Sequence, residues 1–444
     1  MANGELWRMG DMFQLSVELF DTKDKKVVWS DRWQEKWDNL QTIKGSLSDG
    51  LLKALDTKPK VETRLDTTNF EAYDFYLKAK HIYENREDLG DTEIARGLLR
   101  KAIKMDDNLF IAKNVLARTY YISASYDKAM EIYLENLRKA EEIGDKNLTG
   151  TSLYNIGNVF NTKGDIDTAL DYYERSLKFI EEIGDKYVMG YILESIGVVY
   201  DKKGDPYTGL DYFARSLSIA EELSDKSGMA NRLMNIGNAY WQKEDNDKAL
   251  GYFARSLSIA EELGDKNGME CNLTNIGAVY WKKGDYDKAL EYYNRELKIN
   301  EELTIREEIG DKHSLSNYFT NMGLVYFQQK VYNKALEYLN KSATMQMEFD
   351  RPITLETASH LFLSKKILGK EYNVEEIHNL IKEQEDIEDY TNFALFKLLD
   401  DIFYLEAAYN QVQEKANNLE PDIAAKFLNY PIPAAIVEEW EKVK

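Results

Sequence analysis

The chain has 444 residues, 43% of them hydrophobic, and it carries 57 Lys and Arg against 78 Asp and Glu, for a net charge of -21. This hydrophobic content supports a large folded core, and the length favours several domains or a repeat array over one ordinary domain. The acidic surface repels nucleic acid and anionic membranes, and the single cysteine excludes an intramolecular disulfide and a thiolate metal cluster.

The same features indicate a cellular location. The first residues lack the apolar core of a signal peptide, and no apolar run approaches the roughly 20 residues that cross a bilayer. A chain with one cysteine also suits a reducing compartment. We therefore expect a cytoplasmic protein without membrane insertion.

Residues 1–58 predict a small α/β segment. Apolar and polar residues alternate over 12–20, the period of a half-buried strand, and Val27 begins a return strand after a polar turn. Apolar residues then follow one face of a helix over 40–55, and the polar stretch 59–70 predicts a linker. A hairpin with one helix is too small to be stable alone.

This segment resembles the second half of the TolB-amino-terminal-like module, which often precedes tetratricopeptide repeats in bacterial class III nucleotide cyclases and kinase-linked proteins. The resemblance rests on three stretches: Arg8-Met9-Gly10-Asp11, Gln14-Leu15-Ser16-Val17-Glu18-Leu19 and Val28-Trp29-Ser30-Asp31-Arg32. The front half of the module is missing. The resemblance implies a fragment of a longer signalling protein, with a degenerate remnant as the alternative.

A short motif of Asn or Ser, Ile and Gly recurs at intervals of 40 residues, with its glycines at 157, 197, 237 and 277. Ala117 extends the same register backwards, and Gly323 continues it after 46 residues. The glycines at these five positions are termed register glycines. An aromatic residue stands three positions after each of them, a small residue twelve after and a large apolar residue sixteen after.

This order of residues predicts helical hairpins that stack on one another. The register glycine lets the second helix approach the first, and the aromatics, including Tyr240 and Tyr280, are expected to be buried between hairpins. Lys-Gly-Asp at 163–165 and Gly-Asp-Lys at 184–186 are examples of the predicted turns within and between hairpins. There Gly accepts the left-handed conformation that ends one helix, and Asp caps the next.

These landmarks resemble the tetratricopeptide repeat, whose 34-residue unit has the same order of small and aromatic positions. The 40-residue units look like the longer repeats of G-protein-signalling modulators and kinesin light chains. The resemblance covers residues 71–350 and implies an all-α superhelix of about seven hairpins. With the β-hairpin and helix before it and a helical capping region over 351–444 after it, this is the predicted fold.

One unit departs from the period. The six extra residues at 303–308 nearly duplicate the preceding helix end, and they would lengthen that helix by about 9 Å. A tolerated insertion is the favoured interpretation, with a protruding contact as the alternative. Beyond Pro352 helical periodicity continues to about Asn417, and three prolines punctuate the tail.

No catalytic or metal-binding motif emerges. The four histidines lack the paired spacing of a metal site and are expected at the surface or its boundary. The glycine turns lack the order of a phosphate-binding loop, and Cys271 is expected to be a packed thiol. We therefore predict a protein that is not an enzyme and needs no cofactor.

The resemblance implies that the first helix of each hairpin lines a concave groove. An Asn ladder, two positions before the register glycine, would hold the backbone of an extended peptide, while large aromatics would anchor it. The alternative is that the ladder bonds between hairpins and the aromatics merely pack. The predicted groove residues are Arg118, Tyr121, Tyr154, Asn155, Asn158, Asn235, Asn238, Trp241, Asn275, Trp281, Asn321 and Phe327.

The favoured function is a scaffold for a protein or peptide, as the regulatory or sensor part of a multidomain bacterial signalling protein. A first alternative is the regulatory fragment of a class III adenylate or guanylate cyclase, or of a kinase-linked protein. A second is a peptide-pheromone receptor, against which the N-terminal hairpin argues because such receptors normally begin with a helical bundle.

Overall fold

A computed structural model describes residues 2–9, 12–21, 26–36, 69–86, 89–306, 312–348, 352–384 and 386–444. The chain divides into two compact units, Met1–Leu148 and Thr149–Lys444, which are described separately. The division falls inside helix α6, so it does not coincide with any of the predicted domain boundaries, which remain predictions.

The first unit begins with a three-stranded antiparallel sheet in the order β1-β2-β3. Its strands are β1 (Ala2–Met9), β2 (Met12–Asp21) and β3 (Lys26–Lys36). The predicted hairpin corresponds to β2 and β3, whereas β1 was not predicted. The helix predicted over 40–55 lies outside the described residues, as does nearly all of the predicted linker.

Two helical hairpins complete the described part of the first unit. They are α2 (Phe70–Glu84) with α3 (Leu89–Met105), and α4 (Phe110–Ile122) with α5 (Tyr126–Ile143). Arg96 of α3 joins the two pairs, because its buried guanidinium donates to the hydroxyl and the carbonyl oxygen of Thr119 at 2.9 and 2.7 Å. Charge-assisted bonds of this kind are stronger than neutral ones.

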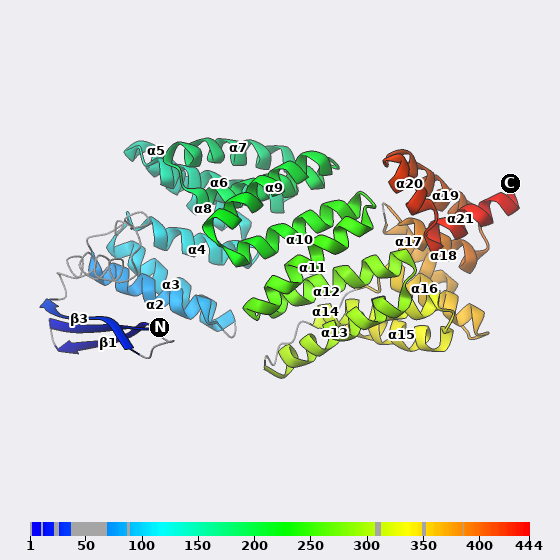
Figure 1. Ribbon diagram of the computed structural model, residues 1–444, viewed down its shortest axis with the longest axis horizontal. Coiled ribbons are helices and arrows are strands. Elements are labelled where there is room, and N and C mark those ends of the chain that lie inside the picture. Colours follow the sequence, from blue (N-terminus) through cyan, green and yellow to red (C-terminus); the bar gives the residue numbers. More distant parts are fainter. Residues whose placement is uncertain are drawn as a thin grey trace. The chain divides into compact units, whose positions relative to one another are not determined.

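The second unit continues the hairpins, whose paired helices are seen in Figure 1. The helices are α6 (Lys146–Thr162), α7 (Ile166–Ile183), α8 (Lys186–Lys202), α9 (Pro206–Leu223), α10 (Lys226–Gln242), α11 (Asn246–Leu263), α12 (Lys266–Lys283), α13 (Tyr286–Arg306), α14 (Lys312–Gln328) and α15 (Tyr332–Glu348). Six further helices follow: α16 (Leu355–Ile367), α17 (Val374–Lys382), α18 (Asp389–Leu399), α19 (Ile402–Asn417), α20 (Pro421–Leu428) and α21 (Pro431–Val443).

The register glycines hold each hairpin together as the sequence predicted. A Cβ atom on Gly237 would lie 2.6 Å from the ring of Phe253, the large residue sixteen positions later. The corresponding distances are 2.7 Å at Gly157 and 2.5 Å at Gly277. Glycine therefore lets an aromatic ring lie directly against the first helix, and these rings are buried.

The turns also follow the prediction. Gly184 ends α7 with a φ of 73°, in the left-handed region that favours glycine. The next residue, Asp185, caps α8 by accepting from the backbone N–H of Val188 at 3.0 Å. The long helix α13 has 21 residues against 18 in α11, so it contains part of the predicted insertion; residues 307–311 lie outside the described part.

The aromatics three positions after the register residues are less buried than predicted. Tyr240 and Tyr280 are only half-buried. Each stacks on a tyrosine of the second helix of its own hairpin, Tyr240 on Tyr252 and Tyr280 on Tyr292, with ring centroids 5.4 and 5.6 Å apart. They lie at the edge of the hairpin because the ring sixteen positions after the register glycine already fills the centre.

The C-terminal helices do more than cap the end of the array. Helix α16 packs on α15, and α21 returns to contact α12, where Pro431 lies against Gly284. Lys426 of α20 forms an ion pair with Asp247 of α11 at 3.1 Å, across 179 residues of sequence. The helices α16–α21, called the tail from here on, therefore lie beside α10–α14. Pro421 and Pro431 begin helices, a position that tolerates a missing N–H.

Candidate functional site

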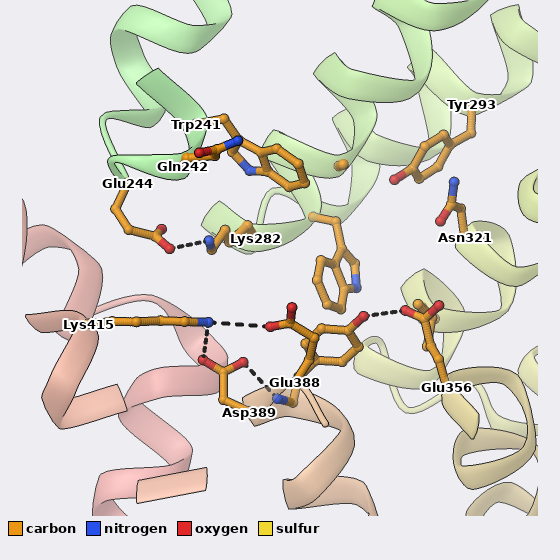
Figure 2. Close-up of a pocket in the computed structure, with 14 residues that line it drawn as sticks. Trp241, Gln242, Glu244, Lys282, Tyr293, Asn321, Glu356, Glu388, Asp389 and Lys415 are labelled. Carbon is orange, nitrogen blue, oxygen red and sulfur yellow. Dashed lines mark hydrogen bonds and ion pairs between the residues drawn. The ribbon is translucent and has the colours of Figure 1, made fainter. Parts of the chain in front are cut away.

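A pocket of about 430 Å³ lies between three first helices of the array and the C-terminal helices. The array contributes residues of α10, α12, α13 and α14, and the tail contributes residues of α16, α18 and α19. Figure 2 shows Trp241, Tyr293 and Asn321 on one side of this space and Glu356, Glu388 and Lys415 on the other. Its volume lies in the range of small-molecule and side-chain sites.

Aromatic rings form much of the wall. Trp241 and Trp281 occupy the position four residues after their register glycines, and Tyr293 lies against Gly277. The ring of Trp281 meets the ring of Tyr390 edge-on, with centroids 5.4 Å apart. Since α18 carries Tyr390, the C-terminal helices cover one face of the array here, and the pocket lies between them and the array.

Charged groups from both the array and the C-terminal helices also line the pocket. The Lys282 ammonium nitrogen lies 2.5 Å from a carboxylate oxygen of Glu244. The Lys415 ammonium nitrogen lies 3.0 Å from a carboxylate oxygen of Asp389 and 3.4 Å from one of Glu388. Glu356 accepts a hydrogen bond from the hydroxyl of Tyr390 at 2.5 Å. No cationic side chain among the described residues lies within ion-pair distance of Glu356. In total, four carboxylates and two lysines line the pocket.

Burial shifts the pKa values of two of these carboxyl groups. It raises the pKa of the Glu356 carboxyl, although the hydrogen bond from Tyr390 acts in the opposite direction. Burial likewise raises the pKa of Glu244, which the nearby Lys282 ammonium partly offsets. Perturbed carboxyl groups in a cleft are a mark of functional sites.

Two hydrogen-bond donors in the pocket wall have no acceptor. The indole N–H groups of Trp241 and Trp281 are buried, and neither has a hydrogen-bond partner among the described residues. Leaving a buried donor unpaired costs about 1–3 kcal/mol. The folded chain therefore retains two costly donors at the same cavity, which favours a functional role over simple packing.

Comparisons with known proteins agree with this architecture. The tetratricopeptide repeat model matches residues 108–182, 189–262, 228–302 and 268–348. The chain belongs to the tetratricopeptide repeat family. No curated protein matches it.

Solved structures share the fold of this tetratricopeptide repeat chain. One is a signal transduction ATPase with numerous domains (STAND) that has a tetratricopeptide repeat sensor, from Pyrococcus horikoshii; it is 15% identical with a TM-score of 0.54, over 79% of this chain and 56% of that one. Another is a Rap protein complexed with competence and sporulation factor, 16% identical with a TM-score of 0.50, over 84% of this chain and 100% of that one. At these identities the likeness shows the fold alone.

The structure brings only some of the predicted groove residues together. Trp241, Trp281 and Asn321 line the pocket, and Phe327 lies beside it with its ring 5.2 Å from that of His360. The rings of Trp241, Trp281 and Phe327 are all half-buried, and Tyr390 of α18 packs on Trp281 while His360 of α16 packs on Phe327.

The Asn ladder is partly used between hairpins. Asn235 donates to Glu194 at 2.9 Å, and Asn275 donates to Asn238 at 3.2 Å, so each joins neighbouring first helices. Asn158 accepts from the hydroxyl of Tyr173 at 2.7 Å, within its own hairpin. Asn155 is half-buried. For Asn235 and Asn275 the packing interpretation is therefore the better one.

The remaining predicted residues do not line the pocket. Tyr154 of the second unit lines a shallow groove of about 330 Å³ with Tyr191, Glu194 and Asn231. Arg118 and Tyr121 belong to α4 of the first unit, where Arg118 is exposed.

Several pocket residues were not predicted at all. Glu356, Glu388, Asp389, Tyr390 and Lys415 come from the tail, outside the repeats. No periodicity relates them to the array, so sequence comparison within the chain could not place them. The change from polar to aromatic residues four positions after the register glycine was the one available signal that another element covers this part.

Two further expectations were wrong. Cys271 is exposed rather than packed. Partial desolvation and the nearby charge of Glu270 still raise the pKa of its thiol, which disfavours the reactive thiolate. His360 is buried rather than at the surface, and burial lowers its pKa to about 4. Among the described residues no cluster of side chains fits a metal ion, and no helix is long and apolar enough to cross a membrane.

Proposed function

We propose that the second unit binds a peptide, or a peptide segment of a partner protein, in the pocket between α10, α12, α14 and the C-terminal helices. The observation that carries this proposal is the pair of tryptophans, which line the pocket and keep buried, unpaired indole N–H groups. Tryptophan is enriched among the residues that dominate binding energy at interfaces.

The composition of the pocket supports a peptide more than a purely apolar ligand. Indole rings and Leu324 offer apolar contact, while Asn321 and four carboxylates offer polar contact. A peptide presents side chains together with backbone carbonyl and N–H groups, so it can use both kinds of wall. Two proteins of similar fold fit a binding role, because the Rap protein was crystallised with competence and sporulation factor and the STAND protein has a tetratricopeptide repeat sensor.

Binding without catalysis is part of the proposal. The lysines of the pocket are engaged in ion pairs, and its carboxylates face aromatic rings and an amide rather than a nucleophile. Repeat arrays of this kind provide extended binding surfaces. The purified chain should therefore neither hydrolyse nor cyclise ATP or GTP; turnover that follows the protein through purification would contradict this.

The experiment is a screen of an immobilised library of short peptides against the full chain and two variants. Trp281→Ala removes a pocket wall, and Trp440→Ala is the matched control, because Trp440 stacks on Tyr409 in the tail and does not line the pocket. We expect peptides that bind the native chain and the control variant but not Trp281→Ala. Binding that is unchanged in Trp281→Ala would contradict the pocket as the site.

A second proposal concerns the cellular role of the chain. We propose that the chain is the regulatory or sensor part of a bacterial signalling protein, as the N-terminal resemblance implies. The support is the antiparallel pairing of β2 with β3, which contain most of the residues that carry this resemblance. The upstream reading frame of the source genome tests it, since a frame without a cyclase, kinase or other signalling domain would contradict it.

A further inference from the structure

The pocket carries more negative than positive charge. Glu244, Glu356, Glu388 and Asp389 line it together with only two cations, Lys282 and Lys415. Both lysines already pair with carboxylates at 2.5–3.4 Å. An anionic ligand would meet surplus carboxylates and no free lysine, whereas a cation would be attracted.

The aromatic wall selects for the same charge. Trp241, Trp281, Tyr293 and Tyr390 surround the cavity, and the negative face of an aromatic ring attracts a cation, most strongly when the cation is desolvated. Lys282 shows the effect within the chain, because its ammonium lies 5.8 Å from the centre of the Trp241 ring. Rings and carboxylates from both the array and the C-terminal helices line the same pocket and form a site for an organic cation (Figure 2).

The unpaired donors distinguish a peptide from a simple cation. The buried indole N–H groups need acceptors, and an ammonium or guanidinium ion has none. A peptide carries backbone carbonyl oxygens next to each side chain, and these oxygens are acceptors for such donors. The pocket therefore offers partners for a cationic side chain and for the peptide backbone next to it.

From this geometry we infer that the pocket takes a basic residue of a peptide, with the guanidinium or ammonium group between the tryptophans and the carboxylates of α16 and α18. The inference rests on the proposed peptide-binding function and names the chemical class of residue that it recognises. Glu356 is the central carboxylate, since it has no cation of its own among the described residues, and Asp389 and Glu388 share a single lysine.

The test uses the full chain and acetylated, amidated tripeptides Ala-X-Ala, where X is Arg, Lys, citrulline or norleucine. Citrulline keeps the shape of arginine without its charge, and norleucine does the same approximately for lysine. We expect the Arg and Lys peptides to bind at least about fivefold more tightly than their uncharged counterparts, as measured by ligand-observed NMR titration. The preference should disappear in the double variant Glu356→Gln, Asp389→Asn and persist in Glu375→Gln, an exposed carboxylate of α17.

The outcomes separate this inference from the proposed function. If charged and uncharged tripeptides bind equally and all are weakened by Trp281→Ala, the pocket binds peptides but the inference is overturned. If methylguanidinium alone binds as tightly as the Arg tripeptide, the pocket recognises a free cation rather than a residue of a peptide, and the inference is overturned. If no tripeptide binds in a manner that depends on Trp281, both proposals fail. Circular dichroism of each variant verifies that the helices are retained.

Discussion

The second unit contains two segments built from the same repeat that present different surfaces. In the open segment, α6 and α8, the residues four positions after the register glycine are Asn161 and Asp201. In the covered segment, α10, α12 and α14, the same position holds Trp241, Trp281 and Phe327. The backbone position is equivalent, and the chemistry is not.

The neighbours of this position explain the difference. In the open segment the side chain accepts from the next hairpin: Lys202 donates to Asn161 at 2.9 Å, and Gln242 donates to Asp201 at 2.7 Å. In the covered segment Trp281 meets Tyr390 and Phe327 meets His360, both from the tail. A repeat position therefore lines a pocket where a non-repeat element packs over it.

The largest effects should be the same in both segments. Tyr173 and Tyr293 occupy the position sixteen after the register glycine, one in the open and one in the covered segment, and both are buried against glycine. Replacing either with Ala should reduce the free energy of unfolding by roughly 3–5 kcal/mol, measured by urea denaturation. A much smaller loss at Tyr293 would show that the hairpin core itself differs between the segments.

A buried acid in the covered segment makes its stability depend on pH. In other hairpins a serine nineteen positions after the register glycine donates to a backbone carbonyl, as Ser176 does to Gly150 and Ser216 to Gly190, both at 2.6 Å. Glu296 takes this position after Gly277, and burial, the dominant cause, raises its pKa to about 8. The hydrogen bond from Thr274 lowers this pKa, and the charge of Glu270 raises it.

Proton linkage sets the direction in which the free energy of unfolding changes with pH. Between the ordinary carboxyl pKa and about 8 the folded chain holds a proton on Glu296 that the unfolded chain loses, so the free energy of unfolding falls as pH rises through this range. Glu296→Ser should remove that slope and stabilise the chain by roughly 2–4 kcal/mol at pH 9. Ser256→Ala is the control, because it leaves Glu296 and its pH slope in place. An unchanged slope in Glu296→Ser would contradict the assignment.

The tryptophan at the junction should couple the tail to the array. Trp281 is half-buried, so Trp281→Ala should cost less than a core change, about 2 kcal/mol. Hydrogen exchange should accelerate in α18–α21 and stay unchanged in α6–α9. Asn161→Ala, the equivalent position in the open segment, should leave exchange in α18–α21 unchanged, since its hydrogen bond joins α6 to α8. Uniform acceleration across the second unit would show that the tail is not a separate layer over the pocket.

The smallest effects concern the Asn ladder. Asn275→Ala removes a hydrogen bond between α12 and α10 and should cost about 1 kcal/mol, as for an ordinary intramolecular hydrogen bond. The same change should leave peptide binding in the pocket intact, since Asn275 does not line it. Loss of binding without loss of stability in Asn275→Ala would restore the ladder as a peptide-binding element.

Local sequence determined the hairpins because short-range sterics and caps determine them. Gly237 opposite Phe253 can be anticipated from spacing alone, since helical periodicity places a residue sixteen positions later on the facing helix. Asp185 as a cap is equally local. The 40-residue repeat therefore predicted the fold class, the turns and the central ring of each hairpin.

Only the tertiary structure decided where the pocket forms. Lys415 and Glu356 belong to helices without repeat register, and their approach to Trp281 depends on how the tail folds back over α12. The sequence marked Trp241 and Trp281 as unusual, but exposure, pairing and pKa depend on which groups exclude water from them. Periodicity fixes which face of a helix a residue occupies, whereas burial of that face depends on packing between elements far apart in the chain.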